Sequence, residues 1–496
     1  MGHARYLELI RQRFGSESSG RNVRTTLYLA IRHLILDGSL LPGTALPPTR
    51  TLADALGFSR STLVRVYAQL VREGYLQSRG GAATSVSEAL PTAMLASPDK
   101  SPRPAPTAAL SQRGQEIARH ATSSRIQGGA FVPGVPDVGL FPFPTWRRLL
   151  SKNVRFEQRH LARYSQGGYG PLKVALAEYL RVSRMMVCSP QQILILNGSH
   201  QAIDLCARML CDPGDRVWME EPGYWGARNV LRANGLQLVP VAVDDEGIAP
   251  PETLDGPPPR LMFVSPSSQY PTGAVMSLAR RLSLLEQAEL HGAWIIEDDY
   301  DNEIRYHPHT LGSLFGQSRT QRVLYLGTFS KVMFPGLRLA YLVVPEHLAE
   351  AFSIGNAELY REGRMIEQAA LAEFIEGGHL SAHLKRMRNV YQERRNVLRA
   401  AIEPRLGAHV TTTGGLAGLH LPYFFETPLD DVALAKDALD AGIVLRPLSM
   451  YYDNPAHRRT GMVLGFAAVR SEDIDAAAGR LCAIVQRHLG RQRIGA

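Results

Sequence analysis

The chain has 496 residues, of which 45% are hydrophobic and 20% are charged. This length is several times the usual domain size of about 100 to 200 residues, so two or three domains are expected, and a peptide or a disulfide scaffold is excluded. The chain lacks an apolar run of membrane-spanning length and an apolar signal segment at its N-terminus, which predicts a soluble cytoplasmic protein without a membrane partner. The four cysteines are neither paired nor regularly spaced, as expected for free thiols, and no metal site is expected.

Positive charge is concentrated near the N-terminus. The formal net charge is +9, and residues 1–90 hold 11 Arg, no Lys and 6 acidic residues. Residues 91–128 add an excess of +3, whereas the remainder, with 39 basic and 38 acidic residues, is almost neutral. A polyanion such as nucleic acid is therefore an expected partner of the N-terminal part. An ordinary solvated basic face is the alternative interpretation.

Composition divides the chain into four segments. Residues 24–87 read as short helices closed by a Gly-containing hairpin, and residues 1–23 form an extension before them. Residues 88–127 are rich in Pro, Ala and Ser, which is typical of a linker. In residues 128–496, short apolar runs such as QILIL, LMFVS and VLYL alternate with helix-like segments. That alternation predicts an α/β domain with a mostly parallel sheet.

Two short helices joined by a tight turn are predicted within residues 24–87. Gly57 supplies the turn, and Ser59 can cap the second helix. Apolar residues at helical spacing form the buried side of that second helix, namely Leu63, Val66, Tyr67 and Leu70. Its exposed start carries the side chains that a helix-turn-helix presents to the major groove, namely Arg60, Ser61, Thr62 and Arg65. A two-helix hairpin that binds no DNA has the same local pattern.

The sequence around this hairpin carries a more specific pattern. The stretch DGSLLPGTALPPTRTLADALGFSRSTLVRVYAQLVREGYLQSRGG closely resembles the winged-helix domain of the GntR regulator family. The resemblance implies a winged helix-turn-helix domain of the α+β class that binds a double-stranded DNA operator. The wing would lie around Gly80 and Gly81, where the family's usual G-x-G-T-x-V reads GGAATSV. The implied DNA contacts are Arg50, Ser59, Arg60, Thr62 and Arg65.

One lysine stands out because the chain has only six lysines against 49 arginines. Lys331 follows the apolar run VLYL within the mostly uncharged stretch LGTFSKVMFPGLRLAYLVV. An amine among apolar neighbours loses its proton more easily, and a neutral amine can form a Schiff base with an aldehyde. An ordinary surface lysine is the alternative for this segment.

Other segments supply the groups that an aldehyde cofactor with a charged ring and a phosphate requires. Asp298 follows the strand-like run AWIIE and could hold a pyridinium nitrogen protonated. After the run QILIL, Gly198 opens a helix whose free amides could bind phosphate. Arg338 could add a bidentate phosphate contact, with hydroxyls from Thr328 and Ser330. Together these groups predict a site for pyridoxal 5'-phosphate.

Residues 128–496 resemble the fold type I aminotransferases, and the whole chain resembles the MocR subfamily of GntR regulators. Stretches that carry the resemblance include YSQGGYGPLKVALAEYL, ILNGSHQAIDL, IIEDDYDNEIRY and GTFSKVMFPGLRLAYLV. It implies an α/β PLP-dependent transferase-like fold with Lys331 as the Schiff-base lysine, Asp298 beside the pyridine nitrogen and Tyr300 beside the phenolic oxygen. Tyr224 would stack on the ring and Tyr164 would reach the partner subunit's site, although core packing is the alternative for both. The phosphate would be lined by Ser199, His200, Ser330 and Arg338.

Two departures from the aminotransferase pattern bear on catalysis. The usual N-P-x-G reads Tyr270-Pro-Thr-Gly, so the amide that donates to the phenolic oxygen is missing, and Tyr270 or Gln269 could substitute. The usual R-[LI]-[SG]-F reads Val463-Leu-Gly-Phe, which puts Val at the position of the carboxylate-binding Arg. Both departures predict that full transamination is slow or absent, while a half-reaction remains open. Four arginines are close in sequence to the missing one: Arg446, Arg458, Arg459 and Arg470.

Three functions are compatible with this pattern. The favoured one is a DNA-binding transcriptional regulator whose aminotransferase-like domain senses pyridoxal phosphate or a small-molecule amine or amino acid. An active aminotransferase with an accessory DNA-binding domain is the main alternative, and a regulator with a vestigial lysine is the third. Both halves of the chain favour a homodimer, which the long linker would allow to be head-to-tail.

Overall fold

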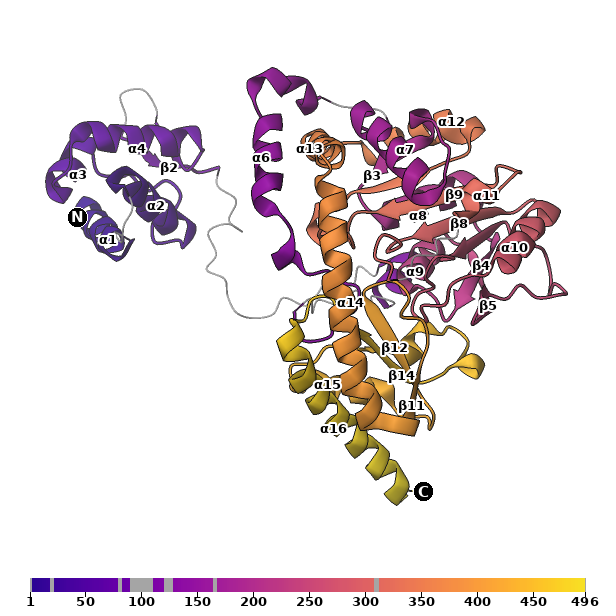
Figure 1. Ribbon diagram of the computed structural model, residues 1–496. Coiled ribbons are helices and arrows are strands. Elements are labelled where there is room, and N and C mark those ends of the chain that lie inside the picture. Colours follow the sequence, from indigo (N-terminus) through magenta and orange to yellow (C-terminus); the bar gives the residue numbers. More distant parts are fainter. Residues whose placement is uncertain are drawn as a thin grey trace. The chain divides into compact units, whose positions relative to one another are not determined.

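A computed structural model describes residues 2–17, 22–78, 83–89, 110–119, 128–163, 167–306 and 312–495. The chain divides into two compact units, Met1–Ala109 and Leu110–Ala496, and each is described by itself (Figure 1). Within the described ranges, no helix is both long and apolar enough to cross a membrane.

The N-terminal unit is a small helical domain closed by a hairpin. β1 and β2 pair antiparallel, with Leu76 opposite Val86, and Ala45 forms a further bridge to Ser85. Its described elements are α1 (Gly2–Glu17), α2 (Val23–Leu36), α3 (Thr49–Leu56), α4 (Arg60–Arg72), β1 (Leu76–Gln77) and β2 (Ser85–Val86). Apolar side chains from α2, α3 and α4 form one core, which includes Leu27, Ile31, Leu52, Leu63, Val66 and Leu70.

Helix α1 belongs to this core, although its sequence placed it in an extension before the domain. Ile10 is fully buried in the same apolar cluster as the side chains of α2 and α4. Phe14 packs edge-on against Phe58, with ring centroids 5.1 Å apart. The helix therefore covers apolar surface that α2 and α3 would otherwise expose.

The turn between α3 and α4 has the geometry that its sequence favours. Gly57 ends α3 with a φ of 73°, a left-handed conformation that costs glycine little. The Ser59 hydroxyl accepts a hydrogen bond from the Thr62 amide at 3.3 Å, which satisfies one of the free amides at the start of α4. The predicted buried side of α4 is observed, because Leu63, Val66, Tyr67 and Leu70 all face the core.

Within the described part of the C-terminal unit, eight strands form one mixed sheet in the order β3-β10-β9-β8-β7-β4-β5-β6. The strands β9, β8, β7, β4 and β5 are parallel to one another, whereas β10 is antiparallel to β3 and β9, and β6 is antiparallel to β5. The bounds are β3 (Ile193–Leu196), β4 (Arg216–Glu221), β5 (Gln237–Asp244), β6 (Gly247–Ile248), β7 (Leu261–Val264), β8 (Trp294–Asp299), β9 (Val323–Thr328) and β10 (Ala340–Val343). The predicted α/β fold is confirmed.

Helices cover both faces of this sheet. Successive side chains of a strand point to opposite faces, so Ile193 and Ile195 pack in one apolar cluster, with α7, α13 and α14, while Leu194 and Leu196 pack in another, with α8 and α9. Burial on both faces explains why these strands read as continuous apolar runs. The helices are α5 (Gln112–Arg119), α6 (Phe143–Asn153), α7 (Gly170–Arg184), α8 (Ser199–Leu210), α9 (Trp225–Ala233), α10 (Leu278–His291), α11 (Leu314–Gln317), α12 (Ala349–Tyr360), α13 (Met365–Glu376) and α14 (His379–Leu406).

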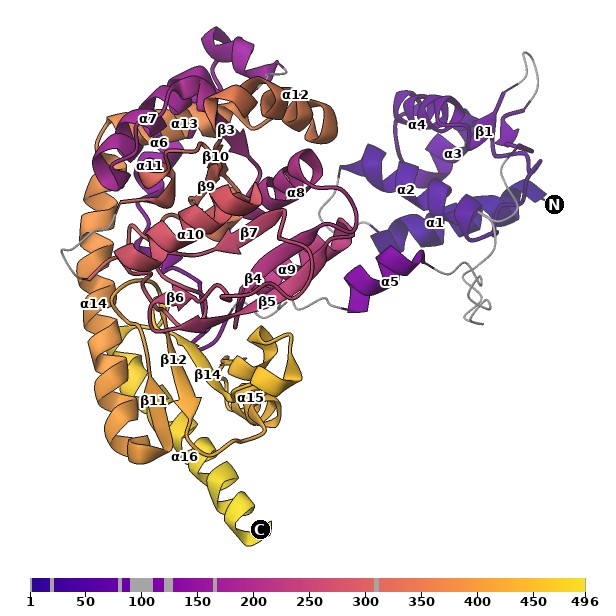
Figure 2. The ribbon, with the colours of Figure 1, turned by 90° about the vertical axis from the view of Figure 1, so that its right-hand side faces the viewer.

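A second sheet follows α14, which runs beside both sheets in the two ribbon views (Figures 1 and 2). The described strands of this sheet are antiparallel in the order β11-β12-β14-β13. Their bounds are β11 (Val410–Thr412), β12 (His420–Phe425), β13 (Arg446–Pro447) and β14 (Gly461–Gly465), and they are accompanied by α15 (Asp431–Asp440) and α16 (Ser471–Gly495). In this sheet Arg446 lies directly opposite Val463.

Candidate functional site

The first candidate surface is the exposed start of α4. Arg60 and Ser61 begin the helix and are exposed, as are Arg50 in α3 and Arg65 one turn further along α4. With other described residues, these three arginines make neither a hydrogen bond nor an ion pair, so their guanidinium groups are available to phosphates and base edges.

Ser59 and Thr62 are already partly engaged within the protein. The Ser59 hydroxyl lies 2.8 Å from the Thr62 hydroxyl and 3.0 Å from that of Ser61, in addition to its capping bond. Ser59 therefore acts first as a helix cap. Gly80, Gly81 and Tyr164, for which the sequence predicts a wing and a subunit contact, lie outside the described residues.

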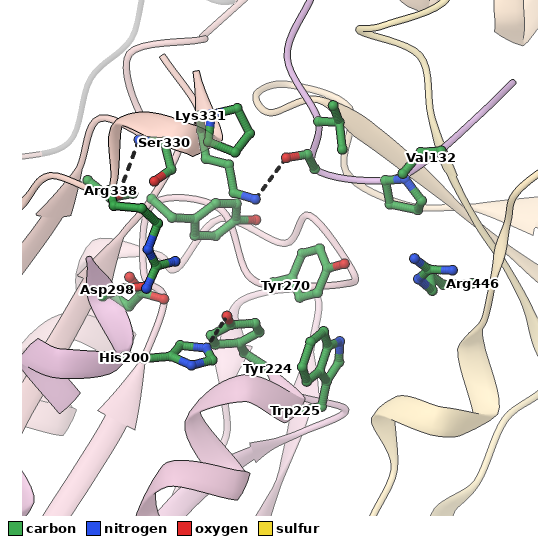
Figure 3. Close-up of a pocket in the computed structure, with 17 residues that line it drawn as sticks. Val132, His200, Tyr224, Trp225, Tyr270, Asp298, Ser330, Lys331, Arg338 and Arg446 are labelled. Carbon is green, nitrogen blue, oxygen red and sulfur yellow. Dashed lines mark hydrogen bonds between the residues drawn. The ribbon is translucent and has the colours of Figure 1, made fainter. Parts of the chain in front are cut away.

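The second candidate site is a cavity of about 280 Å³ in the C-terminal unit (Figure 3). It brings together residues that the sequence had predicted from separate segments. Nine of the predicted cofactor residues line it: Ser199, His200, Tyr224, Asp298, Tyr300, Thr328, Ser330, Lys331 and Arg338. Gly198 does not line the cavity, but it directly precedes Ser199 and lies close to Arg338. Among the described residues, no group of acidic, His or Cys side chains could hold a metal ion.

Lys331 extends into this cavity from the segment after β9. Its Nζ donates a hydrogen bond to the Gly134 carbonyl oxygen at 2.8 Å (Figure 3). Burial lowers the pKa of Lys331, while the negative charges of Asp301 and Asp298 act in the opposite direction. Gly134 has a φ of 71°, and a Cβ there would lie 3.0 Å from the lysine Nζ. Glycine at this position therefore leaves the room that the lysine occupies.

Asp298 is the last but one residue of β8, and it lines the cavity. Its Oδ1 is buried and has no hydrogen-bond partner among the described residues. Burial, together with the negative charges of Asp299 and Glu220, raises the pKa of Asp298 to about 8, with Lys331 acting in the opposite direction. Such an atom needs a donor, and a protonated ring nitrogen in the cavity would be one.

A cradle for an anion lies at the start of α8. Gly198 precedes the helix with a φ of 103°, which favours glycine, and a Cβ there would lie 2.9 Å from Arg338 Nη2, so a larger residue would displace the guanidinium. Arg338 Nη2 donates to the Asn197 carbonyl oxygen at 3.2 Å. Free amides at the N-terminus of α8, the guanidinium and the Ser330 hydroxyl are together suited to a phosphate.

Aromatic and imidazole groups form another wall of the cavity. His200 Nε2 lies 3.0 Å from the Tyr224 hydroxyl. Burial, and then the positive charge of Arg338, lower the pKa of His200, so its imidazole is neutral near pH 7. The Tyr300 hydroxyl is buried and has no hydrogen-bond partner of good geometry among the described residues, so it can contact a polar group in the cavity.

The structure separates the two candidates for the missing amide of the N-P-x-G motif. Gln269 is fully buried, and its amide nitrogen donates to Glu220, the Pro222 carbonyl and the Tyr270 carbonyl. Tyr270 instead lines the cavity, where its hydroxyl lies 2.8 Å from that of Tyr451. Tyr270 is therefore the residue of the pair that faces a bound molecule.

Four arginines are near Val463 in sequence, and one of them lines the cavity. Arg446 does so from β13. Arg458 and Arg459 are exposed, with Arg459 over the Phe424 ring, and Arg470 pairs with Glu472. The lining residues that the sequence did not single out are Val132, Pro133, Gly134, Val135, Trp225 and Pro335. The PGVPD turn after the predicted linker was a possible signal for the segment around Gly134.

Two family models match the chain. The model described as "Bacterial regulatory proteins, gntR family" covers residues 24–86, and "Aminotransferase class I and II" covers residues 136–481. The latter covers most of the chain and includes every lining residue named above except the four that directly precede it, Val132, Pro133, Gly134 and Val135.

Similar proteins include regulators and enzymes. The probable rhizopine catabolism regulatory protein MocR of Rhizobium meliloti is 41% identical over 89% of this chain and 90% of that protein. The pyridoxine biosynthesis transcriptional regulator PdxR of Corynebacterium glutamicum is 29% identical over 90% of this chain and 92% of that protein. The crystal structure of LysN, an α-aminoadipate aminotransferase from Thermus thermophilus complexed with N-(5'-phosphopyridoxyl)-L-leucine, matches with a TM-score of 0.68 and 28% identity, over 77% of this chain and 96% of that one.

These matches support the DNA-binding regulator over an aminotransferase with an accessory domain, since the matched regulators share both parts of this chain and the matched enzyme shares only the C-terminal part. The chain belongs to the MocR type of GntR transcriptional regulators, in which a GntR helix-turn-helix domain is joined to an aminotransferase class I and II domain.

Proposed function

We propose that this regulator binds pyridoxal 5'-phosphate as a Schiff base with Lys331 and senses the cofactor, or an amine or amino acid that reacts with it, to control its binding to an operator. The observation that carries the proposal is the meeting, in one cavity, of a half-buried lysine, a buried carboxyl oxygen that has no hydrogen-bond partner among the described residues, and an anion cradle. When bound, the cofactor would supply an aldehyde for the amine and a ring that withdraws electrons from it.

Lys331 would supply the neutral amine, and Asp298 the negative charge, that the cofactor needs. The lowered pKa of Lys331 increases the fraction of neutral amine, which is the form that attacks a carbonyl. Asp298 would accept a hydrogen bond from the protonated pyridine nitrogen, and that positive charge would favour the ionised carboxylate. Gly134 holds the lysine Nζ through its carbonyl oxygen and orients it toward the cavity.

The remaining lining groups would orient the ring and the phosphate. Arg338, the amides at the start of α8 and the Ser330 hydroxyl would bind the phosphate. Tyr224 would stack on the ring, and Tyr300 would contact the phenolic oxygen. His200, being neutral, can donate to Tyr224 or accept from it without adding charge.

Sensing requires less chemistry than turnover. Val463 stands at the position where aminotransferases carry an arginine for the substrate carboxylate, and Tyr270 replaces the usual Asn. A ligand that favours one conformation is sufficient for regulation, whereas turnover also requires proton transfers, hydrolysis and product release. We therefore propose that the protein retains, at most, a slow half-reaction. We also propose that it is a homodimer in the cytoplasm.

Reduction of the purified protein with borohydride tests the cofactor part directly. After addition of pyridoxal phosphate, reduction and digestion, mass analysis is expected to find a phosphopyridoxyl group on Lys331. Lys331→Ala should remove both the label and the visible absorbance of the bound cofactor. Lys385→Ala, a change at an exposed lysine of α14, is the control and should leave both unchanged. A label on another lysine would contradict the proposal.

A further inference from the structure

The cavity has positive groups at two separate places. Arg338 and the start of α8 lie on one side, and Arg446 lies on the other, with Tyr270 and Trp225 between them (Figure 3). Asp298 is the only carboxylate among the lining residues, and it lies on the same side as Arg338 in Figure 3. One phosphate can engage Arg338, which leaves the Arg446 side without a counterion.

Arg446 has no anionic partner within the described part of the chain. It is half-buried, and no hydrogen bond or ion pair joins it to another described residue. Acidic groups of adjacent segments are already engaged, because Asp453 pairs with Arg232 at 2.5 Å and Asp431 accepts hydrogen bonds from Ser449 and Gly461. A half-buried arginine that lines a cavity without a counterion is suited to bind an anion from solution.

The neighbours of Arg446 are tyrosines. Burial raises the pKa of Tyr270, whereas the hydrogen bond with Tyr451 and the positive charge of Arg446 act in the opposite direction. The ring of Tyr270 packs edge-on against that of Tyr451, with centroids 5.2 Å apart. Arg446 therefore shares its part of the cavity lining with the aromatic residues Tyr270 and Trp225.

The register of the second sheet explains how Arg446 can replace the missing arginine. Arg446 of β13 lies directly opposite Val463 of β14 in an antiparallel pair. Side chains of directly opposite residues project from the same face of a sheet and are close neighbours. Compared with the usual aminotransferase pattern, the arginine therefore lies on the neighbouring strand β13 instead of on β14, with its side chain on the same face of the sheet. Val463 is fully buried in a cluster against which Tyr270 and Trp225 pack, so this face is the one beside the cavity.

We propose that Arg446 determines effector specificity by binding the carboxylate, or an equivalent oxyanion, of a small primary amine. This inference rests on the proposed function, since the amine of the same molecule would react at the Lys331 side. Arginine presents a planar fork that matches a carboxylate with two parallel hydrogen bonds. The effector class is then amino acids and related anionic amines rather than neutral amines.

The test uses the full-length protein loaded with pyridoxal phosphate. Alanine, 3-aminopropanoate and 4-aminobutanoate are titrated against neutral alkylamines with the same number of carbons, and the change in cofactor absorbance gives each affinity. An aminosulfonate of matched length distinguishes a carboxylate from another oxyanion. The variants are Arg446→Gln and Arg446→Lys. The matched control is Arg458→Gln, because Arg458 is exposed and does not line the cavity.

The wild type should prefer at least one anionic amine over its neutral counterpart by about 10- to 100-fold, the effect of a hydrogen-bonded charge pair. Arg446→Gln should remove this preference while leaving cofactor absorbance and neutral-amine affinity unchanged, Arg446→Lys should keep part of it, and Arg458→Gln should match the wild type. A wild type that binds cofactor but shows no anion preference, or an Arg446→Gln variant that keeps it, would overturn the inference alone. A wild type that takes up no cofactor would overturn the proposed function as well.

Discussion

Asp298 and Asp299 are consecutive residues of β8 with opposite electrostatic surroundings. Asp299 pairs with the buried Arg184 at 2.7 Å, whereas the Asp298 Oδ1 faces the cavity without a partner among the described residues. Because neighbouring side chains of a strand point to opposite faces, only one of the two carboxyl groups can face a ligand. The carboxylate of Asp299 instead pairs with the buried guanidinium of Arg184.

The raised pKa of Asp298 predicts that the free energy of unfolding of the cofactor-free protein decreases as pH rises. Its pKa is raised from 3.8 to about 8, so between these values the folded state keeps a proton that the unfolded chain has released. Stability therefore falls as pH rises through this window. Asp298→Asn should be more stable than the wild type at pH 8 by about 5 kcal/mol, with the difference becoming small near pH 4. Urea denaturation of the cofactor-free proteins measures it.

The control for this experiment is Asp440→Asn, the same substitution at the exposed end of α15. With cofactor added, the order should reverse, because Asp298→Asn removes the charge that pairs with the pyridinium. Equal stability of the wild type and Asp298→Asn at both pH values would contradict this account of the carboxyl group.

Gly134 lies against the amine of Lys331 and has a left-handed backbone conformation. Gly134→Ala puts a Cβ 3.0 Å from Lys331 Nζ, on a backbone with a φ of 71°. The lysine should be displaced, so cofactor uptake should fall along with a loss of about 1 to 2 kcal/mol of stability. Gly292→Ala, with a φ of 63° and open space around the new Cβ, is matched for backbone strain. It should lower stability similarly and leave cofactor absorbance intact.

At the scale of elements, α4 combines a buried stripe with an exposed, positively charged start. Arg60 is one of the described arginines without a partner in this unit, and it begins the helix that a helix-turn-helix places in the major groove. Arg60→Ala should weaken operator binding by about 1 to 3 kcal/mol and relax sequence preference if it reads a base. Arg72→Ala, at the other end of α4, should weaken operator binding less and leave the sequence preference unchanged. Gel shifts at fixed salt measure both, and an unaffected Arg60→Ala would mean that another element reads the DNA.

The large sheet and the cofactor residues could be predicted because their signals are local. Buried parallel strands read as apolar runs, and the ends of β3, β8 and β9 carry Gly198, Asp298 and Lys331 within a few residues. The course of β13 and β14 could not be predicted in this way. The pairing of Arg446 with Val463 joins positions 17 residues apart, and only this register shows which of several nearby arginines faces the cavity.

Helix α1 shows a similar limit. Its apolar residues Ile10 and Phe14 are spaced as on a helix, but their partners lie in α2, α3 and the following turn. Charged residues surround them in sequence, so composition alone indicates an exposed extension. Tertiary burial decides the outcome, since most of a short helix's stability comes from packing its apolar face.

At the scale of the whole molecule, the expected assembly is a homodimer. Half-sites of an operator are usually read by paired helix-turn-helix domains, and closed twofold symmetry is the commonest arrangement of soluble oligomers. Light scattering of the cofactor-loaded protein at micromolar concentration should give twice the mass of the 54.6 kDa chain. A stable monomer under these conditions would contradict the assembly.

Regulation by a bound amine should also be separable from catalysis. Incubation with several amines and a keto acid should change the absorption spectrum while product formation remains slow, because Val463 and Tyr270 replace two groups of the aminotransferase site. Sustained turnover at about 1 per second or faster, a normal rate for an enzyme, would favour an active aminotransferase instead.

We expect chemistry at Lys331 to control the affinity of the regulator for DNA. Operator binding measured by fluorescence anisotropy at fixed salt, with and without pyridoxal phosphate and an amino acid that changes the spectrum, tests it most directly. These ligands should change the operator affinity of the wild type by about 5- to 150-fold, as for a typical coupling between sites. Lys331→Ala should bind the operator with one affinity under all conditions. An identical ligand response in the wild type and Lys331→Ala, or no response in either, would contradict the claim.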